Sequence, residues 1–305
     1  MITRPMLAVV VEPKQLSSLR YPQCASIKFD GIRCLMHPAL GPVSRSFKPL
    51  ANIRVRERLE KSNLDYMDGE ILLYGEDGNP LGYNTVQSFV NSDVKSLPSN
   101  WNMVYHVFDD FEFDESPYLS RYGKLGDRIH PGFPHVELVR QEMCHNEHEV
   151  VHYYEKCLDM GHEGIMVRSP DAPYKSGRST LREQFLLKLK PYHDDKGVIT
   201  SVLPMETNQN VPEKDMFGLT KRSSSKSGKH QVEMVGKLEV HTEQWGAVKV
   251  SCGKMTKAQK QKLWKDRENL IGRTITFRYQ SVGMLDKPRF SRFVRLEASQ
   301  GELLT

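Results

Sequence analysis

The stretch Ala25-Ser26-Ile27-Lys28-Phe29-Asp30-Gly31-Ile32-Arg33 contains the most informative residues of this chain. Its apolar start predicts a short strand ending at Lys28, and Asp30 and Gly31 favour a tight turn. A lysine at the end of a rigid strand can be held steady as a nucleophile, and Asp30 and Arg33 bring charges to the same place. A surface lysine before a turn is the simpler alternative, so the rest of the chain has to supply partners for Lys28.

The composition is ordinary for a soluble protein, with 305 residues of which 38% are hydrophobic and 27% charged. That length allows two domains with real cores. We find no apolar run long enough to span a bilayer and no signal-peptide layout at the N-terminus. Five scattered cysteines without CxxC spacing favour a reducing compartment over a zinc site or a disulfide framework. We therefore expect a cytoplasmic protein without a membrane partner.

Charge is unevenly distributed, although the net charge is only +5. Lys and Arg far outnumber Asp and Glu between residues 253 and 295. A basic C-terminal third fits a polyanionic partner. A solvated charged face explains the charge about equally well.

The first part of the chain, to about Pro191, predicts mixed strands and helices, the α+β class. No fixed-period repeat is present, which disfavours solenoids and propellers. The expected strands are Ala25–Lys28, Arg33–His37, Tyr66–Leu73, Met103–Asp109, Gly164–Arg168 and Gln184–Lys190, and the expected helices are Val55–Lys61, Tyr83–Asn91 and Glu147–Met160.

The second part begins at a polar, turn-rich segment, His193-Asp194-Asp195-Lys196-Gly197, which predicts a hinge that lets the domains rotate. We therefore place the domains at 1–192 and 193–305. Thr256 with Gln259 forms a capping-box signature for a helix over Thr256–Glu268. Five short strands around one helix predict a small barrel of the OB type. These strands are Gly197–Leu203, Val232–Val240, Gly246–Ser251, Arg273–Tyr279 and Arg289–Leu296.

A polar stretch within the second part, with three consecutive serines at 223–225, predicts a basic flexible loop near 205–231. Its cations could become ordered on phosphates. A disordered insertion is the alternative. The cations are Lys221, Arg222, Lys226 and Lys229.

Further motifs supply what a lysine needs to attack a phosphate: cations for the phosphates, carboxylates and an aromatic ring. Nearby cations or burial favour the neutral amine that acts as nucleophile. Each short motif is weak alone, but together and in this order they are far stronger. The motifs are Ser44-Arg45-Ser46, Asp68-Gly69-Glu70-Ile71, Tyr105-His106-Val107-Phe108-Asp109, Glu163-Gly164-Ile165-Met166-Val167-Arg168 and Leu187-Lys188-Leu189-Lys190-Pro191.

With these motifs the chain resembles an ATP-dependent DNA ligase of the minimal, phage-like kind, within the covalent nucleotidyltransferase superfamily. The segment Lys28–Arg33 is similar to the family's KxDGxR motif, and Arg289–Arg295 resembles its last motif. The resemblance implies a nucleotidyltransferase (adenylation) domain of antiparallel sheets and helices, followed by a small OB-fold β-barrel. It also implies sealing of 5′-phosphate/3′-hydroxyl nicks in duplex DNA through lysyl-AMP and an adenylylated DNA end. A monomer suffices for this chemistry, and a virus-encoded protein acting in a host cell fits the phage-like pattern.

The resemblance implies a role for each matched residue. Lys28 would attack the α-phosphate of ATP, Glu70 would hold the ribose and Phe108 would stack on adenine. Glu163, with Glu70, would bind Mg²⁺, for which Mn²⁺ is a substitute, since hard oxygen ligands suit these ions. The implied catalytic residues are Lys28, Asp30, Lys188, Lys190 and Arg289, the last helped by Arg295 in orienting pyrophosphate. The implied ATP-binding residues are Arg33, Arg45, Glu70, Phe108, Glu163, Lys188 and Lys190, and the implied DNA-binding residues are Arg33, Arg45, Lys221, Arg222, Lys226 and Lys229.

Two departures from the family pattern concern Ser26, where DNA ligases often carry a Glu that contacts adenine, and Ser291, where Pro is frequent. The alternatives within the superfamily are an RNA ligase and an mRNA-capping guanylyltransferase. The segment from Glu163 and the absence of a tryptophan between Lys188 and Lys190 look more ligase-like. A nucleic-acid-binding protein without catalysis is an alternative of another class, but every expected catalytic position is filled.

Overall fold

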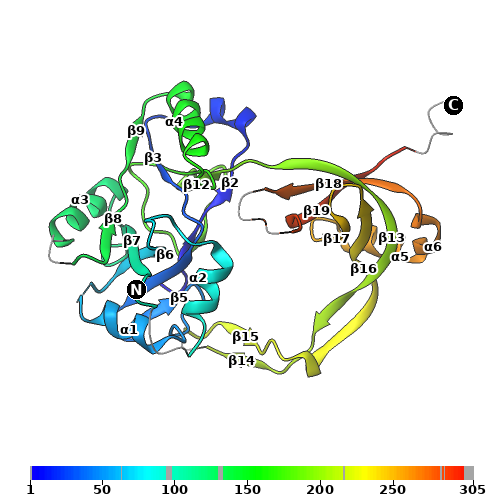
Figure 1. Ribbon diagram of the computed structural model, residues 1–305, viewed down its shortest axis with the longest axis horizontal. Coiled ribbons are helices and arrows are strands. Elements are labelled where there is room, and N and C mark those ends of the chain that lie inside the picture. The colour runs from blue at the N-terminus through cyan, green and yellow to red at the C-terminus, as the bar shows by residue number, and fades with distance from the viewer. Residues whose placement is uncertain are drawn as a thin grey trace. The chain divides into compact units, whose positions relative to one another are not determined.

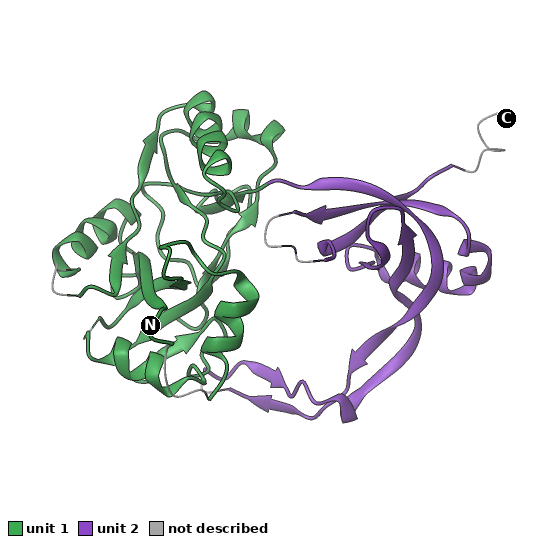
Figure 2. Ribbon diagram, viewed as in Figure 1, with its two compact units in different colours: residues 1–190 green, residues 191–305 purple. Residues whose placement is uncertain are grey.

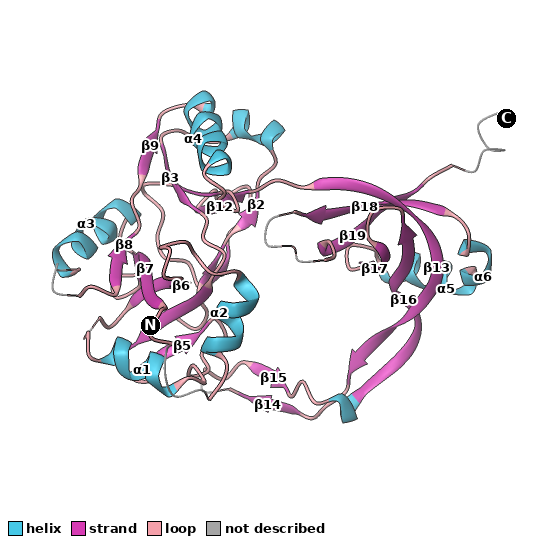
Figure 3. Ribbon diagram, viewed as in Figure 1, coloured by secondary structure: helices cyan, strands magenta, loops and turns pink. Residues whose placement is uncertain are grey.

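The computed structural model describes residues 2–62, 64–93, 98–129, 133–215, 217–281, 284 and 286–298 (Figure 1). The chain forms two compact units, Met1–Lys190 and Pro191–Thr305 (Figure 2). The first unit combines sheets with helices and the second is a closed barrel (Figure 3). This arrangement confirms the α+β class. In the described part of the chain, no helix is both long and apolar enough to cross a bilayer.

Within the described residues, the first unit is built on two five-stranded sheets. The sheet that carries the lysine stretch runs in the order β2, β12, β10, β3, β9, and we call it the β3 sheet. Its strands are β2 (Val9–Val10), β12 (Leu186–Leu189), β10 (Ile165–Arg168), β3 (Gln23–Ile27) and β9 (Glu142–Cys144). Among these, β10 pairs antiparallel with both β3 and β12.

The other sheet, which we call the β6 sheet, runs in the order β5, β4, β6, β7, β8. Its strands are β5 (Gly41–Ser44), β4 (Ile32–His37), β6 (Met67–Tyr74), β7 (Asn102–Asp110) and β8 (Val136–Leu138). A short parallel pair, β1 (Met6–Leu7) with β11 (Gly177–Arg178), completes the strands described in this unit.

Successive side chains of a strand alternate between the two faces of its sheet, so one face can be apolar while the other is polar. In each sheet the apolar face packs against helices. On the β3 sheet, Ala25, Ile165 and Leu187 pack with Leu16 of η1 (Pro13–Ser18) and Val150 of α4 (Glu147–Asp159). On the β6 sheet, the corresponding apolar face packs against α1 (Ile53–Glu60), α2 (Tyr83–Val90) and α3 (Tyr118–Arg128). The opposite faces carry the charged residues, and we call them the inner faces.

The helix α3 lies outside the sequence prediction. Gly123 and Gly126 fall inside it, and glycine is a poor helix former. Burial of Tyr118, Arg121 and Leu125 along one side stabilises the helix instead. Tertiary packing therefore overrides local propensity in this segment.

In the second unit the strands close into a barrel in the order β13, β16, β17, β19, β18. They are β13 (His193–Asn208), β16 (Lys229–Thr242), β17 (Gly246–Ser251), β19 (Arg289–Leu296) and β18 (Thr274–Gln280). Ile199, Leu238, Val250 and Phe277 are in the barrel core. The expected barrel is thus confirmed, with β13 and β16 longer than predicted.

The predicted helix at 256–268 is present in two pieces, α5 (Lys257–Lys265) and α6 (Arg267–Leu270). The predicted capping box is confirmed: Gln259 N donates to Thr256 Oγ1 at 3.2 Å, and Thr256 N donates to Gln259 Oε1 at 2.9 Å. Asp266 ends α5 and begins α6.

The prediction of a hinge at 193–197 is wrong. These residues form the start of β13 and pair with β18 inside the barrel. Asp194, for example, accepts a bond of 2.6 Å from Arg278 Nε. An exposed barrel strand tolerates such a polar sequence because its outer face is solvated.

The prediction of a loop near 205–231 is also wrong for the described residues. β13 and β16 remain paired as far as Asn208 and Lys229, and β14 (Pro212–Lys214) pairs with β15 (Thr220–Arg222). A 3₁₀ turn, η2, spans Lys226–Gly228. Polar residues on both faces of these strands hide the alternating pattern that would have revealed them. Hydrogen bonds such as Asn208 Nδ2 to Ser223 O at 2.8 Å help to hold the segment together.

Candidate active site

The inner faces of the two sheets enclose a cavity of about 240 Å³ in the first unit. Register explains which side chains reach it. Ser26 lies opposite Met166, which in turn lies opposite Lys188, so all three share the inner face of the β3 sheet. Arg33 lies opposite Glu70 on the inner face of the β6 sheet. The lining residues are Leu7, Ala8, Ser26, Ile27, Lys28, Phe29, Arg33, Arg45, Glu70, Phe108, Tyr118, Met166, Arg168, Arg178, Leu186 and Lys188.

Lys28 follows directly after β3 and is held at three points. Its backbone N donates to Gly164 O at 2.9 Å. Its Nζ forms a close ion pair with Glu163 Oε2 and donates to Phe29 O at 3.2 Å. The lysine side chain is 19% exposed and that of Glu163 is 8% exposed. The amine of Lys28 is thus fixed at the edge of the cavity, against the buried carboxylate of Glu163.

Glu163 is shared between two lysines, since Lys190 Nζ lies 3.3 Å from its other oxygen. Burial alone would raise the pKa of Glu163, but the ammonium groups of Lys28 and Lys190 hold that pKa below its usual range. The next residue must be glycine, because a Cβ on Gly164 would lie 2.3 Å from Leu189 O and its φ is +141°. This close approach to β12 brings Glu163 beside Lys190.

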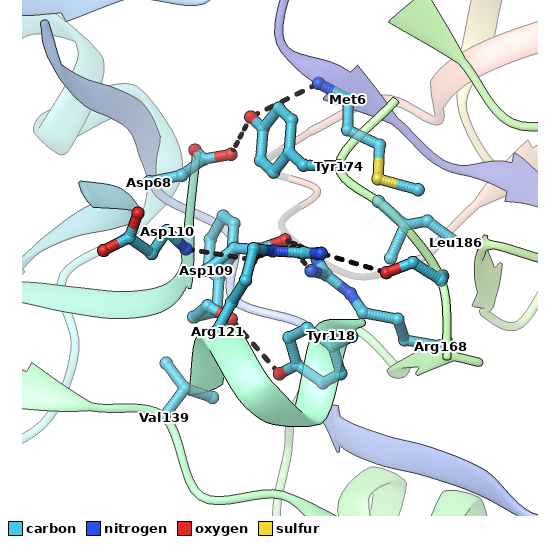
Figure 4. Close-up of polar contacts among 12 residues, drawn as sticks. Met6, Asp68, Asp109, Asp110, Tyr118, Arg121, Val139, Arg168, Tyr174 and Leu186 are labelled. Carbon is cyan, nitrogen blue, oxygen red and sulfur yellow. Dashed lines mark hydrogen bonds and ion pairs between the residues drawn. The ribbon is translucent and has the colours of Figure 1, made fainter. Parts of the chain in front are cut away.

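Arg33 is anchored by Asp68. Its Nε donates to Asp68 Oδ1 at 2.8 Å, Nη2 contacts Oδ2, and Nη1 donates to Met6 O at 2.7 Å. Tyr174 also donates its hydroxyl to Asp68 and accepts from Met6 N at 3.3 Å (Figure 4). Asp68 is fully buried, so this network fixes one side of the cavity.

Phe108 lines the cavity and is the extra residue of a β-bulge. Asp68 pairs with Asp109 while Gly69 pairs with Val107, so β7 has one extra residue at Phe108. Phe108 lies two residues after His106 and therefore faces the same inner side, and the bulge turns the following residue, Asp109, to that side as well. The guanidinium carbon of Arg33 lies 5.5 Å from the centroid of the Phe108 ring.

Asp109 pairs with two buried arginines, Arg121 and Arg168, of which Arg168 also lines the cavity (Figure 4). Arg121 Nε donates to its Oδ1 at 2.9 Å, and Arg168 contacts its Oδ2. The guanidinium of Arg168 also lies 4.3 Å from the centroid of the Tyr118 ring. Burial lowers the pKa of Arg168 and that of Arg121 to about 10, although both stay charged at neutral pH. These contacts tie β7, β10 and α3 together around the cavity.

Burial also shifts the pKa values of two further ionisable groups on the cavity lining, Glu70 and Lys188. Burial raises the pKa of Glu70 to about 7, against the opposing effect of Lys28 and Arg33. Burial also lowers the pKa of Lys188 to about 8, with help from the neighbouring charges of Lys190 and Lys28. Shifts of this kind cluster at functional sites, although structural ion pairs cause them too.

The structure therefore gathers most of the residues that the sequence singled out in this unit. Lys28, Arg33, Arg45, Glu70, Phe108 and Lys188 line the cavity, and Glu163 and Lys190 join it through the lysine ion pairs. Asp30 lies in the turn after Lys28 and is not part of the lining.

The other predicted residues belong to the second unit. Lys221 and Arg222 are in β15, Lys226 is in η2 and Lys229 begins β16. Arg289 begins β19, and Arg295 on the same strand pairs with Glu297 at 2.9 Å.

Sequence reasoning assigned no role to Asp68, Asp109, Arg168, Arg178 or Tyr174. The first three stand inside the quoted motifs, beside residues that did receive a role. What distinguishes them is that they are charged yet buried. The sequence alone does not show this, because their burial results from pairing between strands that are far apart in the chain.

Comparison with known proteins gives two matching family models. One, described as ATP dependent DNA ligase domain, matches residues 5–190. The other, described as DNA ligase OB-like domain, matches residues 227–296. The order of the two folds expected from the sequence is thereby confirmed.

Among curated proteins, the chain is similar to a DNA ligase of Methanothrix thermoacetophila, with 26% identity over 208 residues that cover 62% of this chain. A DNA ligase of Thermococcus onnurineus is 26% identical over 216 residues, or 64% of this chain. The matches span 36% and 37% of those relatives' own lengths.

Among solved structures, the chain is similar to the Chlorella virus DNA ligase-adenylate, with 26% identity and a TM-score of 0.56. That match covers 98% of this chain and 100% of the other. A Lig E DNA ligase structure has a TM-score of 0.67 at 20% identity, covers 97% and 100% of the two chains, and supports the fold alone.

Proposed function

This chain belongs to the ATP-dependent DNA ligase family, and from that premise we propose that it seals 5′-phosphate/3′-hydroxyl nicks in duplex DNA, with ATP as the donor of AMP. The observation that carries the proposal is Lys28 at the edge of a cavity lined by cations, a carboxylate and an aromatic ring. This set matches what transfer of a nucleotidyl group requires, namely positioning and neutralisation of phosphate charge.

In the first step Lys28 Nζ, once deprotonated, attacks the α-phosphorus of ATP. A nitrogen–phosphorus bond forms, the bond from that phosphorus to the bridging oxygen breaks, and pyrophosphate leaves. Lys188 and Lys190 neutralise charge that builds on the α-phosphate oxygens. Glu163 pairs with Lys28 and Lys190 before the nucleotide arrives, which keeps the cluster compact without unbalanced charge.

The cavity suits a nucleoside. Phe108 offers a ring on which adenine can stack, and Glu70 offers a carboxylate to the ribose hydroxyls. Met166 and Leu186 add apolar surface on the β3 sheet. Ser26 lines the same cavity and is 5% exposed, so its hydroxyl is available to contact the base.

The carboxylates also fit a divalent cation. Among the described residues, no group of three or more His, Cys, Asp or Glu could hold a metal alone. Mg²⁺ needs only one or two protein carboxylates when phosphates and water supply the remaining oxygens. Glu70 and Glu163 are close enough to interact electrostatically. Together they would hold Mg²⁺ or Mn²⁺, which neutralises phosphate charge when bound.

Two later steps complete sealing. AMP passes from Lys28 to the 5′-phosphate of the nick, and the 3′-hydroxyl then attacks that phosphate and releases AMP. Arg33 and Arg45 bind the 5′-phosphate, and Arg289, with Arg295, orients the pyrophosphate in the first step. The cations on the β14–β15 hairpin and η2 bind DNA phosphates, and a monomer is sufficient. These cations are Lys221, Arg222 and Lys226, with Lys229 at the start of β16.

The test incubates the full chain with Mg²⁺ and ATP or GTP labelled at the α-phosphate. We expect covalent label from ATP, none in Lys28→Ala, and normal labelling in the control Lys14→Ala, whose side chain is 80% exposed. Labelled protein should then seal nicked DNA faster than nicked RNA. Labelling of Lys28→Ala, preference for GTP, or preference for nicked RNA would each overturn the proposal.

A further inference from the structure

Four residues lie in one row across the β6 sheet. Arg33 on β4 pairs with Glu70 on β6, Glu70 pairs with His106 on β7, and His106 pairs with Glu137 on β8. Side chains directly opposite one another in an antiparallel pair lie about 5 Å apart at Cβ. His106 is thus the neighbour of the carboxylate expected to hold the ribose.

His106 also packs on the residue that follows the lysine. Its ring stacks on Phe29 with centroids 4.4 Å apart and planes 20° apart. His106 is 5% exposed, whereas Phe29 lines the cavity. Lys28 Nζ donates to the carbonyl of this same Phe29 at 3.2 Å. The stack therefore lies one residue away from the lysine.

The imidazole is fixed on both sides by polar groups. Its Nε2 lies 2.7 Å from the hydroxyl of Tyr74, and its Nδ1 lies 3.4 Å from Glu137 Oε2. A carboxylate only accepts, so Nδ1 carries the hydrogen and Nε2 accepts from Tyr74. Burial lowers the pKa of His106 to about 4, which keeps the ring neutral at ordinary pH.

The turn after Lys28 is held at a second point by close packing. A Cβ on Gly31 would lie 2.3 Å from Ile71 O on β6, so the backbone of the turn rests directly on that strand. Phe29 rests on His106 of the next strand. Both supports come from the β6 sheet, while Lys28 N bonds to Gly164 of the β3 sheet. The direction of Lys28 therefore depends on a turn clamped to both sheets.

We propose that His106 is a positioning residue for the nucleophile: by stacking on Phe29 it fixes the turn that aims Lys28 at the α-phosphate. The inference rests on the proposed function of Lys28. A misplacement of about 1 Å can reduce a reaction rate by about 100-fold. Loss of the stack should thus slow AMP transfer to Lys28 while leaving ATP binding nearly intact.

The experiment compares His106→Leu, which fills the space without a flat ring, with His106→Phe, which keeps a ring that can stack. Single-turnover labelling from α-labelled ATP is measured over a range of ATP concentrations. We expect His106→Leu to lower the maximal rate by about tenfold or more with a change of less than about threefold in half-saturating ATP. His106→Phe should recover most of the rate, and Tyr74→Phe should show a smaller loss of the same kind.

A double-mutant cycle with Phe29→Leu supplies the readout that a merely structural role would not move. Residues acting through one stack lose rate together, so the double variant should be no slower than the slower single variant. Additive losses, equal rates for the leucine and phenylalanine variants, or parallel loss of ATP binding would overturn the inference. If His106→Leu does not fold, the cycle is run with His106→Gln, which also lacks a flat ring, and Phe29→Leu, and additive losses there have the same meaning. Failure of the wild-type protein to take label would instead overturn the proposed function.

Discussion

Arg33 and Asp68 form a two-point ion pair on the side of the cavity, with Nε 2.8 Å from Oδ1 and Nη2 in contact with Oδ2. The fork geometry of a guanidinium matches a carboxylate in this arrangement. Asp68 also accepts from Tyr174, so its buried charge is well satisfied. The pair fixes one orientation of Arg33 before any phosphate arrives.

Breaking this pair should destabilise the fold. Asp68→Ala leaves a mostly buried guanidinium without its carboxylate, which costs about 3–5 kcal/mol. Tyr174→Phe removes a single hydrogen bond and should cost about 1 kcal/mol. Urea unfolding at pH 7.5 gives both values, and equal losses would contradict the assigned roles.

The core charges around Asp109 predict a ranking of three variants. Asp109→Ala leaves two buried arginines without their shared carboxylate and should be the most damaging. Arg121→Met leaves Asp109 still paired with Arg168, so its loss should be smaller, and Arg168→Met should resemble it. Thermal unfolding of the three proteins checks the order. An Asp109 variant as stable as the Arg121 variant would disprove it.

The pKa of Glu70 predicts how stability changes with pH. Its folded value, about 7, lies above the ordinary value of 4.5, so between those pH values the folded state binds more protons than the unfolded state. Stability contributed by this group therefore falls as pH rises from about 4.5 to 7. Glu70→Gln should gain stability relative to wild type over that range, as measured by urea unfolding at pH 5, 6 and 8. The control Glu76→Gln, at an exposed position, should show no such trend.

Lys188 should lower the stability of the folded protein at neutral pH, although its charge supports the reaction. Burial and neighbouring cations lower its pKa from 10.5 to about 8, so wild-type stability rises with pH between those values. Lys188→Met should be more stable than wild type at pH 7, by on the order of 1 kcal/mol after solvent screening, and the gain should shrink above pH 8. Labelling from ATP should fall by about 100-fold or more. A variant that is less stable at pH 7 would contradict the prediction.

The hairpin cations predict a change in the salt dependence of DNA binding. Each lost phosphate contact lowers the slope of log affinity against log salt by about 1. Lys221→Ala with Lys226→Ala should therefore flatten the slope by about 2 for nicked duplex DNA, as measured by fluorescence anisotropy. Lys14→Ala serves as the control for removal of a surface cation. An unchanged slope would exclude these lysines from the interface.

The sequence predicted the main strands and the charged residues of the motifs that line the cavity, because strand alternation and motif order can be read along the chain. It singled out Lys188, which the register places on the inner face of the β3 sheet. It could not reveal the Asp109–Arg168 pair, which joins strands 59 residues apart. The sequence did not predict the ends of β13 and β16 or the β14–β15 hairpin for another reason. These exposed strands carry polar residues on both faces and so lack the alternating pattern.

The extra residue at Phe108 has a consequence for anyone who alters the length of β7. Upstream of it, Val107 points into the helix-covered core, and downstream Asp109 binds the buried arginines. Deleting Phe108 itself would restore regular pairing, with Val107 still opposite Gly69 and Asp109 still opposite Asp68, so both side chains would keep their faces. Shortening β7 at the bulge therefore removes one ring from the cavity, whereas a second extra residue in the strand would turn every side chain on one side of it to the opposite face.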